Sequence, residues 1–329
     1  MHPPRFMKFI VLPLLFFSVA SQAYAQTQSE ANAIIQEAFK YMDEGENEKA
    51  LEVFNQAIEN YPNRAIWHLL KGELIADVDR PQFSSDSLQY QKALEEFNQA
   101  IELAPANPKA YTSRALLHFY HQYFNKAIDD YTRVLQFASP FDTATRFYAH
   151  NDRGAAYSYQ GKLNAAVSDY QSALDIRPEA MGVYANLGTL LMNQGNYQEA
   201  EQLYETGLAY DSSSVPLKNN LGLLYVETER YQQAINLFNR LLDQYPKDAF
   251  ILNNLGLARL KTGNLRKARK LIRKSIKLYG NNAAAYKNRA LYYKAKGKTS
   301  KACKDLQKAR SISRKPNSEV MDLIKELGC

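Results

Sequence analysis

An asparagine side chain recurs at a fixed interval in the second half of the chain. Asn186, Asn220, Asn254 and Asn288 are each 34 residues apart, and the first three begin an Asn-Leu-Gly triplet. An amide carries a donor and an acceptor on one planar group, so it can pair with a peptide backbone whatever the peptide's sequence. Either these amides form a binding row for an extended segment, or the position merely requires a small polar residue.

Patterns for catalysis are absent from the sequence. It contains no phosphate-binding loop, dinucleotide fingerprint, nucleophile elbow, CxxC or HExxH. His118 and His121 are three residues apart, but no cysteine accompanies them, and His150 stands alone. We therefore expect no enzyme activity, no cofactor and no metal site.

The first 25 residues have the pattern of a signal peptide. Arg5 and Lys8 precede the apolar run FIVLPLLFFSVA, and a small-x-small sequence ends at Ala25. We expect cleavage after Ala25, a short linker over residues 26–30, and an exported protein that is soluble or peripherally attached. The sequence lacks an Asn-x-Ser/Thr acceptor site, which favours a bacterial periplasm.

If the protein is exported, its two cysteines, Cys303 and Cys329, are in an oxidising compartment. Pairing is the default there, and the sequence predicts a disulfide between them. Free thiols or a bridge to a partner are the alternatives.

Charge is distributed unevenly along the chain, whose formal net charge is +7. Residues 26–248 carry 18 Lys and Arg against 30 Asp and Glu, whereas residues 249–316 carry 20 against Asp305 alone. Such a basic segment indicates contact with an anionic partner, and a solvated face is the alternative.

The asparagine interval belongs to a repeat that runs through most of the sequence. Alanine recurs at eight fixed points, a bulky residue follows each four positions later, and Ala or Gly precedes seven of them by twelve. The fixed points are Ala50, Ala93, Ala127, Ala166, Ala200, Ala234, Ala268 and Ala302. Small residues at two fixed positions allow two helices to approach closely, and one hairpin cannot bury its own apolar stripe.

This pattern resembles the tetratricopeptide repeat, a helix-turn-helix of 34 residues, over residues 31–316. The resemblance implies an all-α solenoid, a right-handed superhelix of eight repeats, followed by a capping helix and the terminal Cys over residues 317–329. The repeats are 31–64, 65–107, 108–141, 147–180, 181–214, 215–248, 249–282 and 283–316. Repeat 2 carries an insertion, and residues 142–146 separate repeats 3 and 4.

Positions 7 and 23 of the repeats vary together. Where position 7 is basic, position 23 is acidic, and where position 7 is Leu in repeats 5–7, position 23 is Leu. The two helices of a repeat must therefore meet there, as a structural ion pair or an apolar contact. The expected ion pairs are Arg114–Asp130, Arg153–Asp169, Arg289–Asp305 and Lys71–Glu96.

The resemblance also implies that the first helix of each repeat lines a concave groove. The four recurrent asparagines occupy position 6, and Asn151, Asn219 and Asn253 occupy position 5. The arrangement is similar to the asparagine ladder in the repeat domain of the nucleocytoplasmic N-acetylglucosamine transferase. The resemblance thus implies a non-enzymatic adaptor or scaffold that binds an extended segment of a protein partner in the groove.

A second interpretation rests on the basic C-terminal repeats. An envelope-associated scaffold could use them to contact anionic lipid or an acidic protein, and salt-sensitive self-association with the acidic repeats is a further alternative. Nucleic acid is not expected as a partner of an exported protein. The densest candidates for this contact are Arg266, Lys267, Arg269, Lys270, Arg273, Lys274 and Lys277.

Overall fold

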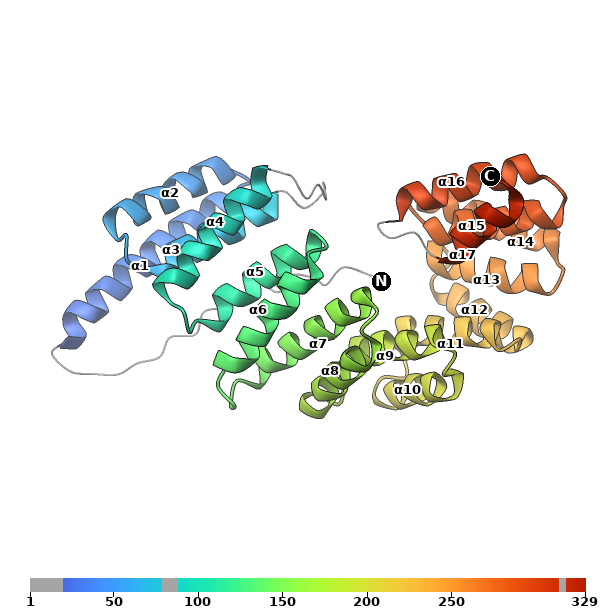
Figure 1. The fold of residues 1–329 in the computed structure, drawn as a ribbon, viewed down its shortest axis with the longest axis horizontal. Helices are drawn as coiled ribbons and strands as arrows, with labels where there is room; N and C mark the ends of the chain where they lie inside the picture. The colour runs from blue at the N-terminus through green and yellow to red at the C-terminus, as the bar shows by residue number, and fades with distance from the viewer. Residues whose placement is uncertain (1–19, 79–87, 314–317) are drawn as a thin grey trace. The chain divides into compact units, whose positions relative to one another are not determined.

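The computed structural model describes residues 20–78, 88–313 and 318–329, and in these ranges every regular element is an α-helix (Figure 1). The predicted all-α solenoid class is therefore confirmed. The helices are α1 (Ala20–Asp43), α2 (Asn47–Asn60), α3 (Ala65–Val78), α4 (Leu88–Leu103), α5 (Pro108–Tyr120), α6 (Phe124–Phe137), α7 (Thr143–Gln160), α8 (Leu163–Ile176), α9 (Met181–Asn193), α10 (Tyr197–Tyr210), α11 (Val215–Glu227), α12 (Tyr231–Gln244), α13 (Ala249–Lys261), α14 (Leu265–Leu278), α15 (Ala283–Ala295), α16 (Thr299–Ile312) and α17 (Ser318–Leu327).

Consecutive helices pack in pairs, one pair per predicted repeat, from α1 with α2 to α15 with α16. The first helices α9, α11, α13 and α15 begin at Met181, Val215, Ala249 and Ala283, which are the first residues of the last four predicted repeats. Each pair also packs against the next within a unit, so apolar surface that one hairpin leaves exposed is buried by its neighbour.

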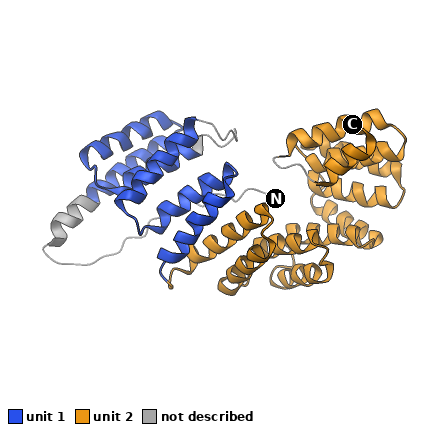
Figure 2. Cartoon of the chain, in the orientation of Figure 1, with its two compact units in different colours: residues 1–139 blue, residues 140–329 orange. Residues whose placement is uncertain are grey.

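The chain divides into two compact units, residues 1–139 with α1–α6 and residues 140–329 with α7–α17 (Figure 2). In the first unit, Trp67, Phe54 and Phe97 are fully buried between the helix pairs. In the second, Tyr204, Leu217 and Phe238 have the same role. Each unit thus has its own core.

Close approach within a repeat depends on the small residue at position 8. A Cβ atom added at Gly188 would lie 2.3 Å from the ring of Tyr204, and one at Gly222 would lie 2.5 Å from that of Phe238. The aromatic ring of the second helix thus rests directly on the backbone of the first.

In repeats 1 and 3–8, whose inner turns are described, the turn contains a left-handed residue, which is Gly195 at φ +82° in repeat 5. Gln122 and Glu229 adopt positive φ at the same point of repeats 3 and 6.

Three details differ from the sequence expectations or lie beyond the described residues. Residues 26–30, expected as a linker, are helical because α1 begins at Ala20. Residues 143–146 extend the first helix of repeat 4, with Asp142 as its N-cap, whose Oδ1 accepts from the Thr145 amide at 3.0 Å. Most of the predicted leader (1–19) and the centre of the repeat 2 insertion (79–87) are outside the described residues.

Helix α17 closes the C-terminal end of the second unit. Val320 and Leu323 are buried against Leu306 and Ala309 of α16, so α17 covers apolar surface of repeat 8. Lys294 Nζ lies 2.6 Å from a Glu326 carboxylate oxygen, and Cys303 and Cys329 form a disulfide with their Cα atoms 5.3 Å apart. The cap is therefore held by a covalent bond as well as by packing.

None of the described helices has both the length and the hydrophobicity needed to cross a membrane.

Candidate functional site

The recurrent asparagines lie on α9, α11, α13 and α15, the first helices of repeats 5–8, and several bond to one another. Asn254 Nδ2 donates to Asn219 Oδ1 at 2.9 Å, and Asn288 Nδ2 donates to Asn253 Oδ1 at 3.0 Å. In both cases the amide at position 6 reaches the position 5 amide of the preceding repeat. Asn253 Nδ2 donates to Asn254 Oδ1 at 3.1 Å and links the two pairs.

The C-terminal part of this row is buried, which corrects the expectation of seven amides facing a groove. Asn253, Asn254 and Asn288 are 2%, 7% and 1% exposed. Helix α13 is packed on most of its surface, and a buried amide is costly unless it is hydrogen-bonded, so these amides pair across the helix interface. They join successive repeats and cannot reach a ligand.

The N-terminal part of the row remains accessible. Asn186, Asn219 and Asn220 are half-buried, and none is fully shielded from solvent. Asn220 Nδ2 donates to Thr189 Oγ1 at 3.2 Å, which leaves its carbonyl oxygen free, and Asn219 keeps its NH₂ group. No hydrogen bond of the Asn186 side chain occurs within the described residues. These three amides therefore retain hydrogen-bonding capacity on neighbouring helices α9 and α11.

Repeat 4 differs at the same two positions. Asn151 Nδ2 donates to Asp152 Oδ1 at 2.8 Å, and Asp152 occupies the position at which repeats 5–8 carry asparagine. No cation of the described residues pairs with this carboxylate. Burial raises the pKa of Asp152 to about 6, and the hydrogen bond from Asn151 offsets only part of that rise.

This raised pKa gives a testable pH dependence. The ionised carboxylate is disfavoured in the folded state, so the stability associated with Asp152 is complete below about pH 4 and is lost as pH rises through about 6. Asp152→Asn should therefore stabilise the second unit by about 1–2 kcal/mol at pH 8. Urea unfolding at pH 8 and pH 4 measures this, and an advantage of the variant that persists unchanged at pH 4 would contradict it.

The expected ion pairs link the two helices of their repeats. Arg114, Arg153 and Arg289 each place two guanidinium nitrogens within 2.9 Å of the carboxylate oxygens of Asp130, Asp169 and Asp305. Lys71 Nζ lies 2.6 Å from Glu96 Oε1. The three aspartates are at most 5% exposed, so each needs the partner to remain ionised.

Histidines complete three of these pairs, which the sequence reasoning did not anticipate. His68 Nδ1 lies 2.7 Å from Glu96, and His150 Nδ1 lies 2.9 Å from Asp169. Both occupy position 4 of their repeats, so the shared position was an available signal. Burial opposes ionisation of Asp169, but the hydrogen bonds from Arg153 and His150 outweigh it and lower its pKa.

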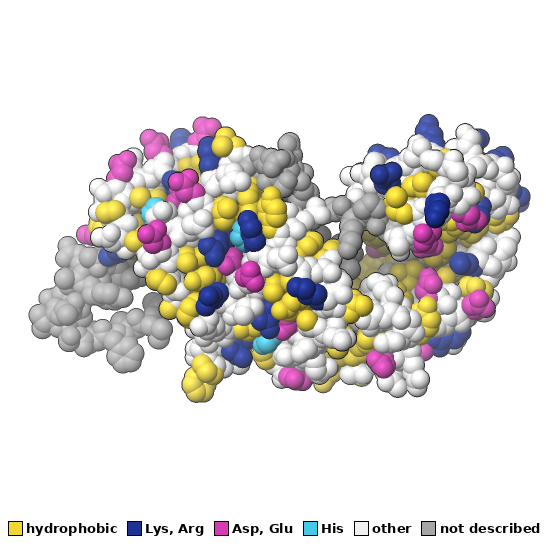
Figure 3. Space-filling view, viewed as in Figure 1, with side chains coloured by type: hydrophobic (Ala, Val, Ile, Leu, Met, Phe, Trp, Pro, Cys, Tyr) yellow, Lys and Arg dark blue, Asp and Glu magenta, His cyan; other side chains and the backbone are white. Residues whose placement is uncertain are grey.

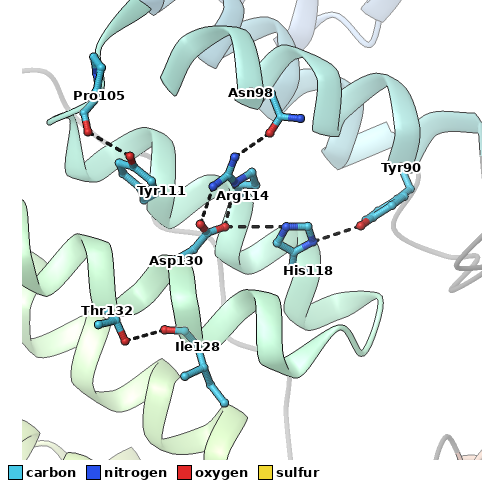
Figure 4. A network of polar contacts seen from close by, with 9 residues as sticks. All are labelled: Tyr90, Asn98, Pro105, Tyr111, Arg114, His118, Ile128, Asp130 and Thr132. Carbon is cyan, nitrogen blue, oxygen red and sulfur yellow. Dashed lines mark hydrogen bonds and ion pairs between the residues drawn. The ribbon is translucent and has the colours of Figure 1, made fainter. Parts of the chain in front are cut away.

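His118, at position 11 of repeat 3, lies beside the third of these pairs, Arg114–Asp130 (Figure 4). Its Nε2 lies 3.8 Å from Asp130, and its Nδ1 lies 3.1 Å from the hydroxyl of Tyr90. Burial lowers the pKa of His118 to about 3, so the ring is neutral at physiological pH. The described residues contain no group of three or more His, Cys, Asp or Glu side chains placed to hold a metal ion.

A shallow pocket lies between α8 and the α9–α10 turn, and no sequence pattern predicts it. It encloses about 660 Å³, is widely open to solvent, and is lined mainly by polar side chains, among them Asn164, Ser168, Gln171, Gln194 and Asn196. Because it is shallow and widely open to solvent, it is a poor site for a small molecule.

The seven cations expected to contact an anion all lie on α14 and are exposed. Lys274 Nζ donates to the carbonyl oxygen of Pro246 at 3.0 Å. None of the seven forms a salt bridge with a carboxylate of the described residues.

Comparison with known proteins agrees with this architecture. A family model described as "Tetratricopeptide repeat" matches residues 35–77, 185–249, 219–283 and 253–318, and a second, "TPR repeat", matches residues 154–195. The chain belongs to the tetratricopeptide repeat family. Repeats of this family generally serve as scaffolds for protein–protein interaction and are generally not enzymes.

Several solved structures share the fold. A tetratricopeptide repeat protein from Parabacteroides merdae has a TM-score of 0.65 and 19% identity, with 91% of this chain and 98% of that chain covered. Yeast Tom70 has a TM-score of 0.60 and 14% identity, with 86% and 58% covered. A chain of the APC/C hetero-tetramer Cut9–Hcn1 has a TM-score of 0.56 and 18% identity, with 89% of this chain and 55% of that chain covered. A search of curated proteins gave no match.

Proposed function

We propose that the chain is a non-enzymatic scaffold that binds an extended protein segment along α9 and α11. The observation that carries this proposal is the open part of the amide row, Asn186, Asn219 and Asn220, whose donors and acceptors are not all used within the fold. Half-buried Leu223 lies one helical turn beyond Asn219 and Asn220 and supplies apolar surface beside them. Amides with an apolar neighbour suit an extended, partly hydrophobic segment.

The proposed site spans fewer repeats than the sequence indicated. Asn253, Asn254 and Asn288 are buried, whereas Asn151 is half-buried, so the segment would bind repeats 5 and 6 and, through Asn151, the neighbouring repeat 4. We also propose that the chain acts after export, because residues 1–25 resemble a leader and the Cys303–Cys329 disulfide suits an oxidising compartment.

Short random peptides displayed on phage provide the test. Peptides selected on the full chain should bind the Asn186→Ala, Asn219→Ala, Asn220→Ala variant at least about tenfold more weakly, because each lost hydrogen bond contributes about 0.5–1.5 kcal/mol. Isothermal titration calorimetry measures the difference.

The matched control replaces three exposed asparagines of the same unit, Asn193, Asn236 and Asn239, with alanine. This control should bind the selected peptides as the parent does. Peptides that bind all three proteins equally would refute the amide row as the site.

A further inference from the structure

Helix α14 presents two opposite faces. Ala268, Ile272 and Ser275 are buried against the rest of the unit. The other face consists of the seven exposed cations Arg266, Lys267, Arg269, Lys270, Arg273, Lys274 and Lys277, which we call the basic face. Lys and Arg side chains lie on the surface over the C-terminal repeats in the view of Figure 3.

The described residues do not neutralise the charge of the basic face. No carboxylate of the described residues forms a salt bridge with the basic face, although Arg153, Arg230 and Arg289 elsewhere in the unit each have one. Like charges on one helix repel each other, so the concentration of cations costs stability. Repeat packing requires the buried side of α14, and within the described residues Lys274 is the one member of the basic face whose side chain forms a hydrogen bond.

Exposed apolar side chains border the C-terminal end of the basic face. Leu278 and Tyr279 end α14 and are 44% and 45% exposed. Phe250 is 40% exposed, with its ring centroid 5.6 Å from that of Tyr279. The hydrogen bond from Lys274 to Pro246 places the turn containing Tyr245, which is 45% exposed, against the same helix. We call these four side chains, three of which are aromatic, the aromatic rim.

We propose that the basic face and the aromatic rim together dock the protein on an anionic lipid bilayer surface. The cations would contact phosphate-bearing headgroups, and the rim would enter the interfacial layer, where Tyr and Phe side chains are favoured. An acidic protein, including the acidic repeats of a second copy, would complement the cations but would give no reason for four exposed apolar side chains at one end. The combination of charge and rim favours the membrane surface.

This surface is separate from the proposed peptide site. The amides of Asn186, Asn219 and Asn220 lie on α9 and α11, whereas the basic face lies on α14, the second helix of repeat 7. The two proposals can therefore fail independently.

Vesicle co-sedimentation of the full chain provides the test, with phosphatidylcholine vesicles that contain or lack phosphatidylglycerol. The chain should bind only the anionic vesicles, and binding should weaken as salt rises. Each cation near an anionic surface strengthens binding about fivefold, so Arg266→Glu, Lys270→Glu, Arg273→Glu should weaken it about a hundredfold or more. Phe250→Ser with Tyr279→Ser should remove the part of the binding that persists at high salt.

The matched control reverses three exposed cations of the first unit, Lys40→Glu, Lys92→Glu and Arg133→Glu, with the same change in net charge. Vesicle binding by this control should be unchanged, and an equal loss in both triple variants would refute a local site. Failure of the wild-type chain to bind anionic vesicles would also overturn the proposal. Salt-sensitive dimers in analytical ultracentrifugation, abolished by the α14 variant without any vesicle binding, would assign the surface to a second copy.

Discussion

Replacing Gly188 with valine should destabilise the second unit by about 3 kcal/mol or more, at the upper end of what overpacking costs. A Cβ atom at Gly188 would lie 2.3 Å from Tyr204 Cε1, and valine adds two further methyl groups. Tyr204 is fully buried and its hydroxyl lies 3.3 Å from Thr189 Oγ1, so the ring has no empty space to enter. Helices α9 and α10 must therefore separate.

Urea unfolding followed by circular dichroism, with amide exchange to locate the loss, measures this effect. The same substitution at Gly182, on the same helix, provides the control because an added Cβ atom there meets nothing within 4 Å. Gly182→Val should change the stability by no more than about 0.5 kcal/mol. Equal effects at the two glycines would mean that backbone propensity, and not helix contact, decides the outcome.

Most of the fold was predictable because the same contact residues recur at the same positions in successive repeats. Gly188, Gly222 and Gly256 mark the contact between the helices of a pair, and rings or Ile272 fill the space opposite. A single hairpin would not have distinguished a required glycine from an incidental one. Features that occur only once were harder to predict. Residues 143–146 were expected to separate two repeats, but they extend α7, because Asp142 caps a helix there and does not begin a loop.

The candidate site was only partly predictable, and the reason is burial. Asn220 and Asn254 have the same repeat position and the same neighbours in sequence, but one is half-buried and the other is 7% exposed. Position 5 of the preceding repeat is Ala185 for Asn220 and Asn219 for Asn254, so Asn254 donates to an amide whereas Asn220 donates to the Thr189 hydroxyl. Which internal partner an amide finds is a property of two adjacent repeats, so a pattern within one repeat does not reveal it.

The ion pair of repeat 8 should behave as a unit in a double-mutant cycle. Arg289→Leu leaves the carboxylate of Asp305, which is 5% exposed, without its two guanidinium hydrogen bonds and should cost about 3–5 kcal/mol. Asp305→Leu should cost less, about 2–3 kcal/mol, because the Arg289 side chain is 22% exposed and water can reach part of it.

The double variant should recover to within about 1 kcal/mol of the wild type, since Leu in both positions removes both buried charges. Repeat 5 has leucines at both of these positions, Leu187 and Leu203, and the two residues belong to one apolar cluster. Urea unfolding of the four proteins gives a coupling free energy, and additive costs would show that the two side chains act separately. A large coupling would explain why positions 7 and 23 change together from repeat to repeat: the helix contact accepts a salt bridge or a pair of leucines but not one half of each.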